Sequence, residues 1–289
     1  MGFPGKVAIL GHSGFIGSHL ENYLSQSSLS SWNVVGHSLP DVDLTDWESA
    51  RQLKYVFDNE TSIILAAAVK RQFGDTLSAF RQNLSIVENL CQLLAEKPVK
   101  QVIFLSSAAV YGEETENTFI DEETPVNPTS FYGIAKYTSE RLLRKTCLEQ
   151  KISSLVCLRP PLIYGPDDQG QTYGPSGFCS AAMAGKPITL WGDGTELREF
   201  VFIDDLCKIV EKLLSSDIFT ELNVVSGLSY SFVDIISILK HKFPELKVET
   251  RPRSKTKANN AFNPERINSF LPSDFEFTSL EQGILKLIP

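Results

Sequence analysis

Three glycines near the N-terminus have the spacing of a phosphate-binding turn. They follow a short apolar run, in the order Val7-Ala8-Ile9-Leu10-Gly11-His12-Ser13-Gly14-Phe15-Ile16-Gly17. Gly11 can adopt backbone angles that a Cβ forbids, Gly14 lets the main chain approach a pyrophosphate, and Gly17 lets a following helix pack tightly on the strand. The amides and the dipole at the start of that helix would face the phosphate charge. In 289 residues with 18 glycines, this spacing arises by chance only roughly 0.07 times per chain, so it predicts a dinucleotide site.

A tyrosine, a lysine and a serine form a second candidate group. Tyr132 and Lys136 lie four residues apart in a segment with helical periodicity, so their side chains share one face of a helix. Ser107 ends an apolar run that is typical of a strand. A Tyr-x-x-x-Lys pair alone is weak evidence, because a surface tyrosine and a solvated lysine give the same pattern. Together with the glycine turn and Ser107, the pair predicts a reaction site at the mouth of a sheet.

Strand-like and helix-like segments alternate through the first half of the chain and would position these residues. The predicted strands are Val7–Leu10, Trp32–Gly36, Ile63–Ala66, Gln101–Ser106 and Leu155–Arg159. The predicted helices are Phe15–Ser25, Trp47–Phe57, Leu77–Ala95 and Tyr132–Gln150. Such alternation implies right-handed β-α-β crossovers and a parallel sheet with helices on both faces. We therefore expect an α/β fold with a doubly wound parallel sheet of the Rossmann type, whose ligands lie at the carboxyl ends of the strands.

Turn-forming residues become more frequent after about residue 165. Turn-forming residues cluster over 165–177 and again over 191–195. We expect residues 1–165 to form the dinucleotide-binding domain and residues 166–289 a smaller α/β substrate-binding portion. The segments 199–216 and 221–226 again resemble strand, helix and strand, so residues 199–227 are expected to rejoin the first domain.

Composition excludes several classes of partner. A formal charge of −8 and a pI near 5.2 leave no basic surplus for binding nucleic acid. The one basic run, Arg251–Lys257, is short and suits a solvated loop or one anionic ligand. No apolar run reaches the ~20 residues that span a bilayer, and no stretch of signal-peptide type opens the chain. Five scattered cysteines and four histidines without ligand spacing predict a cytoplasmic protein with reduced thiols and no metal.

Five motifs in order resemble one family, the extended short-chain dehydrogenase/reductases of the NAD-dependent epimerase/dehydratase type that act on nucleotide sugars. The motifs are Gly11-x-x-Gly14-x-x-Gly17, the run 106–112 (Ser-Ser-Ala-Ala-Val-Tyr-Gly), Tyr132-Gly133-Ile134-Ala135-Lys136, the block from Arg159-Pro160 to Tyr164-Gly165-Pro166, and the block from Trp191-Gly192-Asp193-Gly194 through Arg198-Glu199-Phe200 to Asp204-Asp205. The likeness covers nearly the whole chain. It implies a nicotinamide cofactor, a nucleotide-sugar substrate and a possible homodimer formed through the predicted helices 77–95 and 132–150.

The resemblance also implies roles for individual residues. Tyr132 would be the general acid/base, Lys136 would stabilise the tyrosinate and hold the nicotinamide ribose, and Ser107 would hydrogen-bond the reacting oxygen. Arg198 would grip a substrate diphosphate. The expected cofactor-binding residues are Gly11, Ser13, Gly14, Phe15, Ile16, Gly17, His37, Ser38, Asp43, Leu44, Ala66, Ala67, Ala68, Tyr132 and Lys136. The expected substrate contacts are Lys70, Arg71, Ala108, Ala109, Trp191, Arg198 and Arg251.

Departures from the family pattern narrow the reaction. Where 4,6-dehydratases carry an acidic pair after the serine, this chain has Ala108 and Ala109. The run from Val34 to Asp46 is closest in pattern to GDP-fucose synthase-like 4-ketoreductases, but the cysteine and histidine used there for epimerisation are Ala109 and Gly177 here. We therefore expect an NDP-4-keto-6-deoxyhexose 4-reductase. A UDP-sugar 4-epimerase with retained NAD and a non-catalytic dinucleotide sensor are the alternatives.

The end of the second predicted strand bears on the choice of cofactor. An acidic residue there would bind the adenosine ribose 2′-hydroxyl and repel a 2′-phosphate. This chain has His37 and Ser38 at that place, and both can donate hydrogen bonds. The sequence favours NADP(H), with NAD(H) as the alternative.

Overall fold

Parallel strands in the first half of the chain build a single sheet. The computed structural model describes residues 5–27, 32–70, 74–168, 174–253 and 256–288. Strand β1 pairs in parallel with β2 and with β3, and β4 pairs in parallel with β3 and with β6. A further strand, β10, completes the order β10-β6-β4-β3-β1-β2. The strands are β1 (Gly5–Leu10), β2 (Trp32–His37), β3 (Thr61–Leu65), β4 (Gln101–Leu105), β6 (Ser154–Arg159) and β10 (Phe219–Asn223). The expected doubly wound parallel sheet is confirmed.

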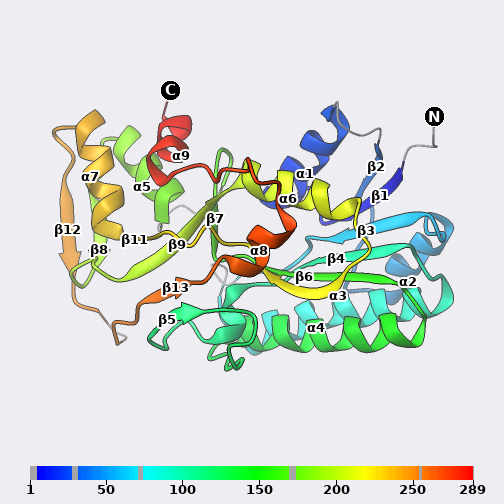
Figure 1. Ribbon diagram of the computed structural model, residues 1–289. Coiled ribbons are helices and arrows are strands. Elements are labelled where there is room, and N and C mark those ends of the chain that lie inside the picture. Colours follow the sequence, from blue (N-terminus) through cyan, green and yellow to red (C-terminus); the bar gives the residue numbers. More distant parts are fainter. Residues whose placement is uncertain (1–4, 28–31, 71–73, 169–173, 254–255, 289) are drawn as a thin grey trace. The chain divides into compact units, whose positions relative to one another are not determined.

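Helices cover both faces of this sheet. In Figure 1, α3 and α4 run along one face, and α1 and α6 lie on the other. The helices are α1 (Phe15–Gln26), α2 (Trp47–Ala50), α3 (Leu77–Glu96), α4 (Phe131–Glu149) and α6 (Ile203–Leu214), with 3₁₀ turns η1 (Arg51–Tyr55) and η3 (Ala108–Tyr111). Fully buried aliphatic and aromatic side chains from the strands and from α3 and α4 form a core, with Leu10, Ile63 and Phe104 among them. This core holds the carboxyl ends of the strands in place.

One predicted helix is shorter than expected. The segment 47–57 begins as α2, with the Asp46 side chain accepting the amide of Ser49 as a cap. From Arg51 the backbone tightens into the 3₁₀ turn η1. Leu53 and Phe57 are buried in the core, so packing sets the path of the chain there rather than continuing one regular helix.

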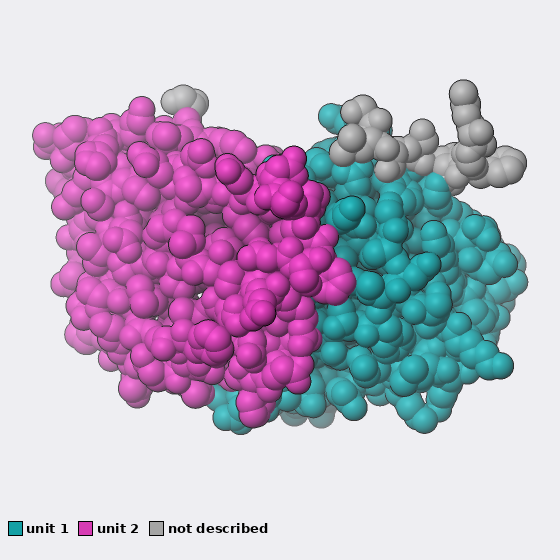
Figure 2. Space-filling model, in the orientation of Figure 1, with its two compact units in different colours: residues 1–110, 126–159, 207–222 teal, residues 111–125, 160–206, 223–289 magenta. Residues whose placement is uncertain are grey.

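The chain divides into two compact units (Figure 2). Unit 1 comprises residues 1–110, 126–159 and 207–222, and unit 2 comprises residues 111–125, 160–206 and 223–289. Unit 2 contains a three-stranded sheet in the order β11-β9-β7 and two strand pairs, β12-β8 and β13-β5. Its elements are β5 (Asn117–Ile120), β7 (Leu162–Tyr164), α5 (Gly174–Met183), β8 (Ile188–Trp191), β9 (Leu197–Phe202), β11 (Ser229–Ser231), α7 (Phe232–Lys242), β12 (Val248–Arg251), β13 (Asn260–Phe262), α8 (Glu265–Phe270) and α9 (Leu280–Leu287).

Helix α5 begins inside the segment that the sequence suggested as turns. Gly174 opens it with a φ of +75°. Pro175 follows in the first turn, where the missing amide proton of a proline costs nothing. Most of the helix is buried, including Phe178 and Cys179. Burial of these side chains therefore explains a helix where glycine and proline indicated a loop.

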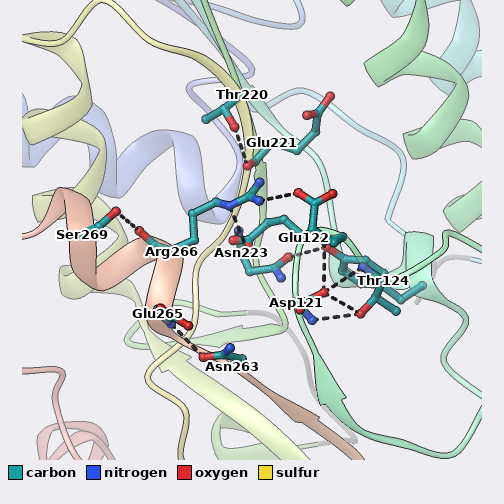
Figure 3. A network of polar contacts seen from close by, with 12 residues as sticks. Asp121, Glu122, Thr124, Thr220, Glu221, Asn223, Asn263, Glu265, Arg266 and Ser269 are labelled. Carbon is teal, nitrogen blue, oxygen red and sulfur yellow. Dashed lines mark hydrogen bonds and ion pairs between the residues drawn. The ribbon is translucent and has the colours of Figure 1, made fainter.

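A polar network stabilises one part of unit 2 (Figure 3). Glu122, whose side chain is 3% exposed, accepts the amide of Asn223 at 2.8 Å and lies 3.6 Å from Nε of Arg266 in α8. The Arg266 guanidinium also bonds Glu123 at 2.5 Å. The amide oxygen of Asn223 accepts the hydroxyl of Tyr111 at 2.9 Å. These contacts join the residues that follow β5 to Asn223 and to α8, and they stabilise this part of unit 2.

Candidate active site

The three glycines of the turn differ in how closely the protein packs around them. Gly11 has a φ of +93°, and a Cβ there would lie 2.5 Å from the backbone nitrogen of Ala67. A Cβ on Gly17 would collide with the carbonyl oxygen of Gly11. Gly14 is exposed, and a Cβ there would make only ordinary contact with the turn. Gly11 and Gly17 are thus required by the protein itself, whereas Gly14 leaves the backbone open to a ligand.

The start of α1 is left open for an anion. Its cap residue, Gly14, has no side chain to accept the first amides of the helix, and the first turn holds no acidic residue. Side chains cap the two long helices of unit 1, Thr76 for α3 and Ser130 for α4. Uncapped amides and the helix dipole form an anion site. The turn therefore fits the pyrophosphate of a dinucleotide.

The turn lies where the strand order of the sheet reverses. After β1 the chain passes to β2 on one side, whereas β3 returns to the other side of β1. The amides of Ala66 and Ala67 both donate to the carbonyl oxygen of Leu10, at 2.9 and 2.8 Å. In open α/β sheets such a switch point, at the carboxyl ends of the strands, is where ligands bind. Ala68 follows these two residues.

The end of β2 lies beside the same turn. The amide of Gly11 donates to the carbonyl oxygen of His37 at 2.8 Å. Ser38 is buried, and its hydroxyl donates to the carbonyl oxygen of Leu39. Asp43 bonds Thr45 twice through one carboxylate oxygen, and these bonds lower the pKa of Asp43. Leu44 is buried, and its carbonyl oxygen accepts the side chain of Asn89.

Tyr132 is positioned by contacts at the start of α4. Ser130 caps the helix by accepting the amide of Gly133 at 3.0 Å. The amide of Tyr132 donates to the carboxylate of Asp75, just before α3, at 3.0 Å. A Cβ on Gly133 would lie 2.6 Å from the carbonyl oxygen of Ala109, so the helix packs directly on the turn that follows Ser107. The Ser107 hydroxyl accepts the amide of Ala109 at 3.1 Å.

Lys136 is buried one helical turn beyond Tyr132. Its ammonium group lies 5.6 Å from the centroid of the Tyr132 ring and donates to the carbonyl oxygen of Leu105 at 2.5 Å. Leu105 ends β4, two residues before Ser107. Burial lowers the pKa of Lys136 to about 8, and the charge of Glu140 acts in the opposite direction. In its cationic form this lysine can stabilise a phenolate beside it.

A buried ion pair lies one further turn along α4, and the sequence analysis missed it. Both carboxylate oxygens of Glu140 accept from the guanidinium of Arg159, at 2.9 and 2.7 Å, and one also accepts the hydroxyl of Ser106. The pair joins α4 to β6 and to the residue before Ser107. Glu140 follows Lys136 by the same four-residue interval that separates Lys136 from Tyr132. This spacing places all three side chains on one face of the helix, and it was the sequence feature that could have identified Glu140.

Breaking this pair should destabilise the protein strongly. The side chains of Glu140 and Arg159 are 1% and 5% exposed. Glu140→Ala leaves a buried guanidinium without its carboxylate, which costs about 3–5 kcal/mol in the free energy of unfolding. Denaturant unfolding measures the loss. Glu149→Ala on the same helix is the control, because Glu149 pairs with Lys145 at the surface, where such a pair is worth about 1 kcal/mol or less. Equal losses in the two variants would contradict the assignment.

The remaining predicted substrate contacts lie in both units. In unit 1, Lys70 lies over the ring of Phe15, 5.4 Å from its centroid, Ala108 and Ala109 form part of η3, and Arg71 lies outside the described residues. In unit 2, the guanidinium of Arg198 donates to the carbonyl oxygens of Leu197 and Ala258, at 2.7 and 2.6 Å. Trp191 is half exposed, and the guanidinium of Arg251 lies 6.0 Å from its ring centroid.

Two absences hold for the described residues. No group of three or more histidine, cysteine, aspartate or glutamate side chains there could hold a metal ion. No helix among them is both long enough and apolar enough to cross a bilayer.

Known proteins resemble this chain in sequence. A model of the NAD dependent epimerase/dehydratase family matches residues 7–224. The N-acetyl-alpha-D-glucosaminyl-diphospho-ditrans,octacis-undecaprenol 4-epimerase of Escherichia coli O157:H7 is 26% identical over 241 residues, which cover 79% of this chain and 67% of the relative. The GDP-6-deoxy-D-talose 4-dehydrogenase of Aggregatibacter actinomycetemcomitans is 24% identical over 284 residues, which cover 95% and 94%.

Solved structures share the fold. The UDP-glucuronic acid 4-epimerase from Bacillus cereus, in complex with UDP-glucuronic acid and NAD, superposes with a TM-score of 0.83 at 22% identity and covers 97% of each chain. RMD from Pseudomonas aeruginosa, complexed with NADPH, superposes with a TM-score of 0.84 at 20% identity and covers 98% of this chain and 97% of its own.

Proposed function

The chain belongs to the NAD dependent epimerase/dehydratase family, and from that premise we propose that it is an NDP-4-keto-6-deoxyhexose 4-reductase. One observation carries the proposal: the buried ammonium group of Lys136 lies beside the Tyr132 ring and bonds the end of β4. A binding module has no need of a buried cation next to a phenol, because burying it is costly. A phenol that transfers protons benefits from such a cation, because the positive charge favours the phenolate.

The side chains of unit 1 would carry the reaction. When bound, the nicotinamide cofactor supplies the hydride that reduces the sugar ketone. Tyr132 donates a proton to the ketone oxygen, which becomes the C4 hydroxyl. Lys136 stabilises the phenolate that remains, since an adjacent positive charge favours the ionised form. Ser107 donates a hydrogen bond to the same oxygen and holds it near the phenol.

Reduction is favoured over the family's other reactions. Elimination of water needs an acid and a base after Ser107, and Ala108 and Ala109 offer neither. The 4-dehydrogenase of Aggregatibacter actinomycetemcomitans, which matches this chain almost end to end, acts at the same sugar carbon by its name. Many of the other relatives are named as 4-epimerases. An epimerase that retains NAD is therefore the second candidate.

We further propose that unit 1 binds the dinucleotide, at the glycine turn and the switch point, and that unit 2 supplies substrate contacts. Arg198, Arg251 and Trp191 offer two cations and an aromatic face, which suit a diphosphate and a base. NADP(H) is the preferred cofactor in this proposal, since no carboxylate follows β2 directly and Ser38 lies there. NAD and NADPH both occur in the solved relatives.

A cofactor assay separates the candidates. The purified protein is mixed with NADPH or NADH and with 4-keto-6-deoxyhexoses carrying UDP, GDP, CDP or dTDP, and oxidation is followed by absorbance. A reductase oxidises NADPH in stoichiometric amounts and forms a 4-hydroxy sugar. Bound NAD in the purified protein, together with C4 epimerisation of a UDP-sugar, would replace the reductase by the epimerase. Firm NADPH binding without turnover of any sugar would favour a sensor, and NADH bound as well as NADPH would overturn the cofactor preference.

A further inference from the structure

A histidine in the turn after β1 pairs with a carboxylate of α1, and the proposed reaction uses neither group. Nδ1 of His12 lies 2.9 Å from a carboxylate oxygen of Glu21 in α1. A carboxylate can only accept, so Nδ1 carries the proton in this contact. Within the described part of the chain, Nε2 of His12 has no hydrogen-bond partner. This nitrogen accepts a hydrogen bond when the ring is neutral and donates one when the ring is protonated.

The pair packs against the end of β2. A Cβ on Gly36 would collide with the His12 ring and would lie 2.7 Å from the other carboxylate oxygen of Glu21. The absence of a side chain at Gly36 is therefore what allows both groups to reach this place. His12 and Glu21 are 30% and 35% exposed, so a ligand can contact them.

The end of β2 is the part of a dinucleotide fold that distinguishes the two nicotinamide cofactors. An acidic residue of the strand ordinarily accepts the 2′-hydroxyl of the adenosine ribose. In this chain the strand ends in His37, and the carboxylate arrives from α1 instead, behind the ring of His12. The group that would face the ribose is thus an imidazole that a carboxylate orients.

We propose that His12, oriented by Glu21, contacts the group at the 2′ position of the adenosine ribose. The protonation state of His12 then sets the preference between NAD(H) and NADP(H). The neutral ring accepts the 2′-hydroxyl of NAD(H) at Nε2. The protonated ring donates a charge-assisted hydrogen bond to the 2′-phosphate of NADP(H). The preference for NADP(H) over NAD(H) therefore rises as the pH falls, because the ring becomes protonated. The inference rests on the proposed dinucleotide site.

Other titratable or charged groups face this corner from each neighbouring element. Glu21 comes from α1, and His37 ends β2. Burial, and to a smaller extent the charge of His12, lower the pKa of His37, so its neutral form is favoured. The segment after β3 contributes Ala67 against Gly11 and then Lys70 over the Phe15 ring. His12 is the group whose charge change would alter a contact with the 2′ position.

Binding measurements test the proposal. The dissociation constants of NADP⁺ and NAD⁺ are determined by calorimetry from about pH 6 to about pH 8.5, where histidines change charge, for the whole chain and three variants. In the wild type, the ratio of the two constants should change at least about tenfold across this range, as expected for gaining a hydrogen bond to a charged group. His12→Gln should remove this change, because glutamine does not titrate. Glu21→Gln should weaken the binding of NADP⁺, because the contact between Nδ1 of His12 and the carboxylate that orients the ring is lost.

Two controls separate the possible failures. The 2′-phosphate itself gains a proton near pH ~6, and the difference between wild type and His12→Gln removes that contribution. His19→Gln changes a histidine of α1 whose ring bonds the carbonyl oxygen of Phe15, and this variant should behave as the wild type. The same pH dependence in His12→Gln as in the wild type, with both cofactors bound, would overturn the inference. If neither cofactor binds any of these proteins, the proposed function itself is wrong.

Discussion

Tyr132→Phe should lower kcat by a factor of about 10²–10⁴, the usual contribution of a positioned proton donor. The cofactor dissociation constant should stay within about twofold of the wild type. The change removes only the phenol oxygen, whereas the backbone contacts that hold this residue, to Asp75 and at the start of α4, remain. Steady-state rates with the 4-keto sugar, together with calorimetric titration of NADPH, measure both quantities.

Tyr137→Phe is the matched control. Tyr137 lies on the same helix, directly after Lys136, and is partly buried as Tyr132 is. The control should keep nearly the full rate, because its hydroxyl is not part of the proposed site. Full turnover by the Tyr132 variant would show that another group delivers the proton, and the reductase mechanism would have to be abandoned.

Gly17→Ala should weaken cofactor binding and destabilise the fold. The added Cβ collides with the carbonyl oxygen of Gly11 and lies 2.7 Å from the Cα of His12, and both of these are backbone atoms that cannot rotate away. The turn must therefore open, at a cost of about 1–3 kcal/mol from overpacking. Both the melting temperature without cofactor and the affinity for NADPH should fall, the affinity by at least about tenfold.

Gly14→Ala distinguishes loss of the fold from loss of the ligand. A Cβ there lies 3.4 Å from the nearest protein atom, and the φ of −79° suits any residue. This variant should keep the wild-type melting temperature but bind the cofactor more weakly, because the new methyl group stands where the pyrophosphate approaches. Wild-type affinity in both glycine variants would place the dinucleotide elsewhere.

Local patterns in the sequence were enough to predict the sheet and its main helices. The predicted helices 77–95 and 132–150 correspond to α3 and α4, with no end shifted by more than one residue. The five predicted strands all lie in the parallel sheet. This succeeds because apolar periodicity and glycine spacing act over a few residues, and each reports directly on a strand, a helix face or a turn. The family could be named for the same reason.

Contacts between distant residues were decided only by the tertiary structure. The carboxylate of Asp75 meets the amide of Tyr132 across 57 positions, and Arg159 meets Glu140 across 19. The 3₁₀ turn that follows the short helix α2 and the buried start of α5 likewise depend on packing.

The residue types that we propose for proton transfer and phosphate binding could thus be identified from the sequence alone. The partners that orient and charge them could not, because burial and charge pairing depend on which elements the fold brings together.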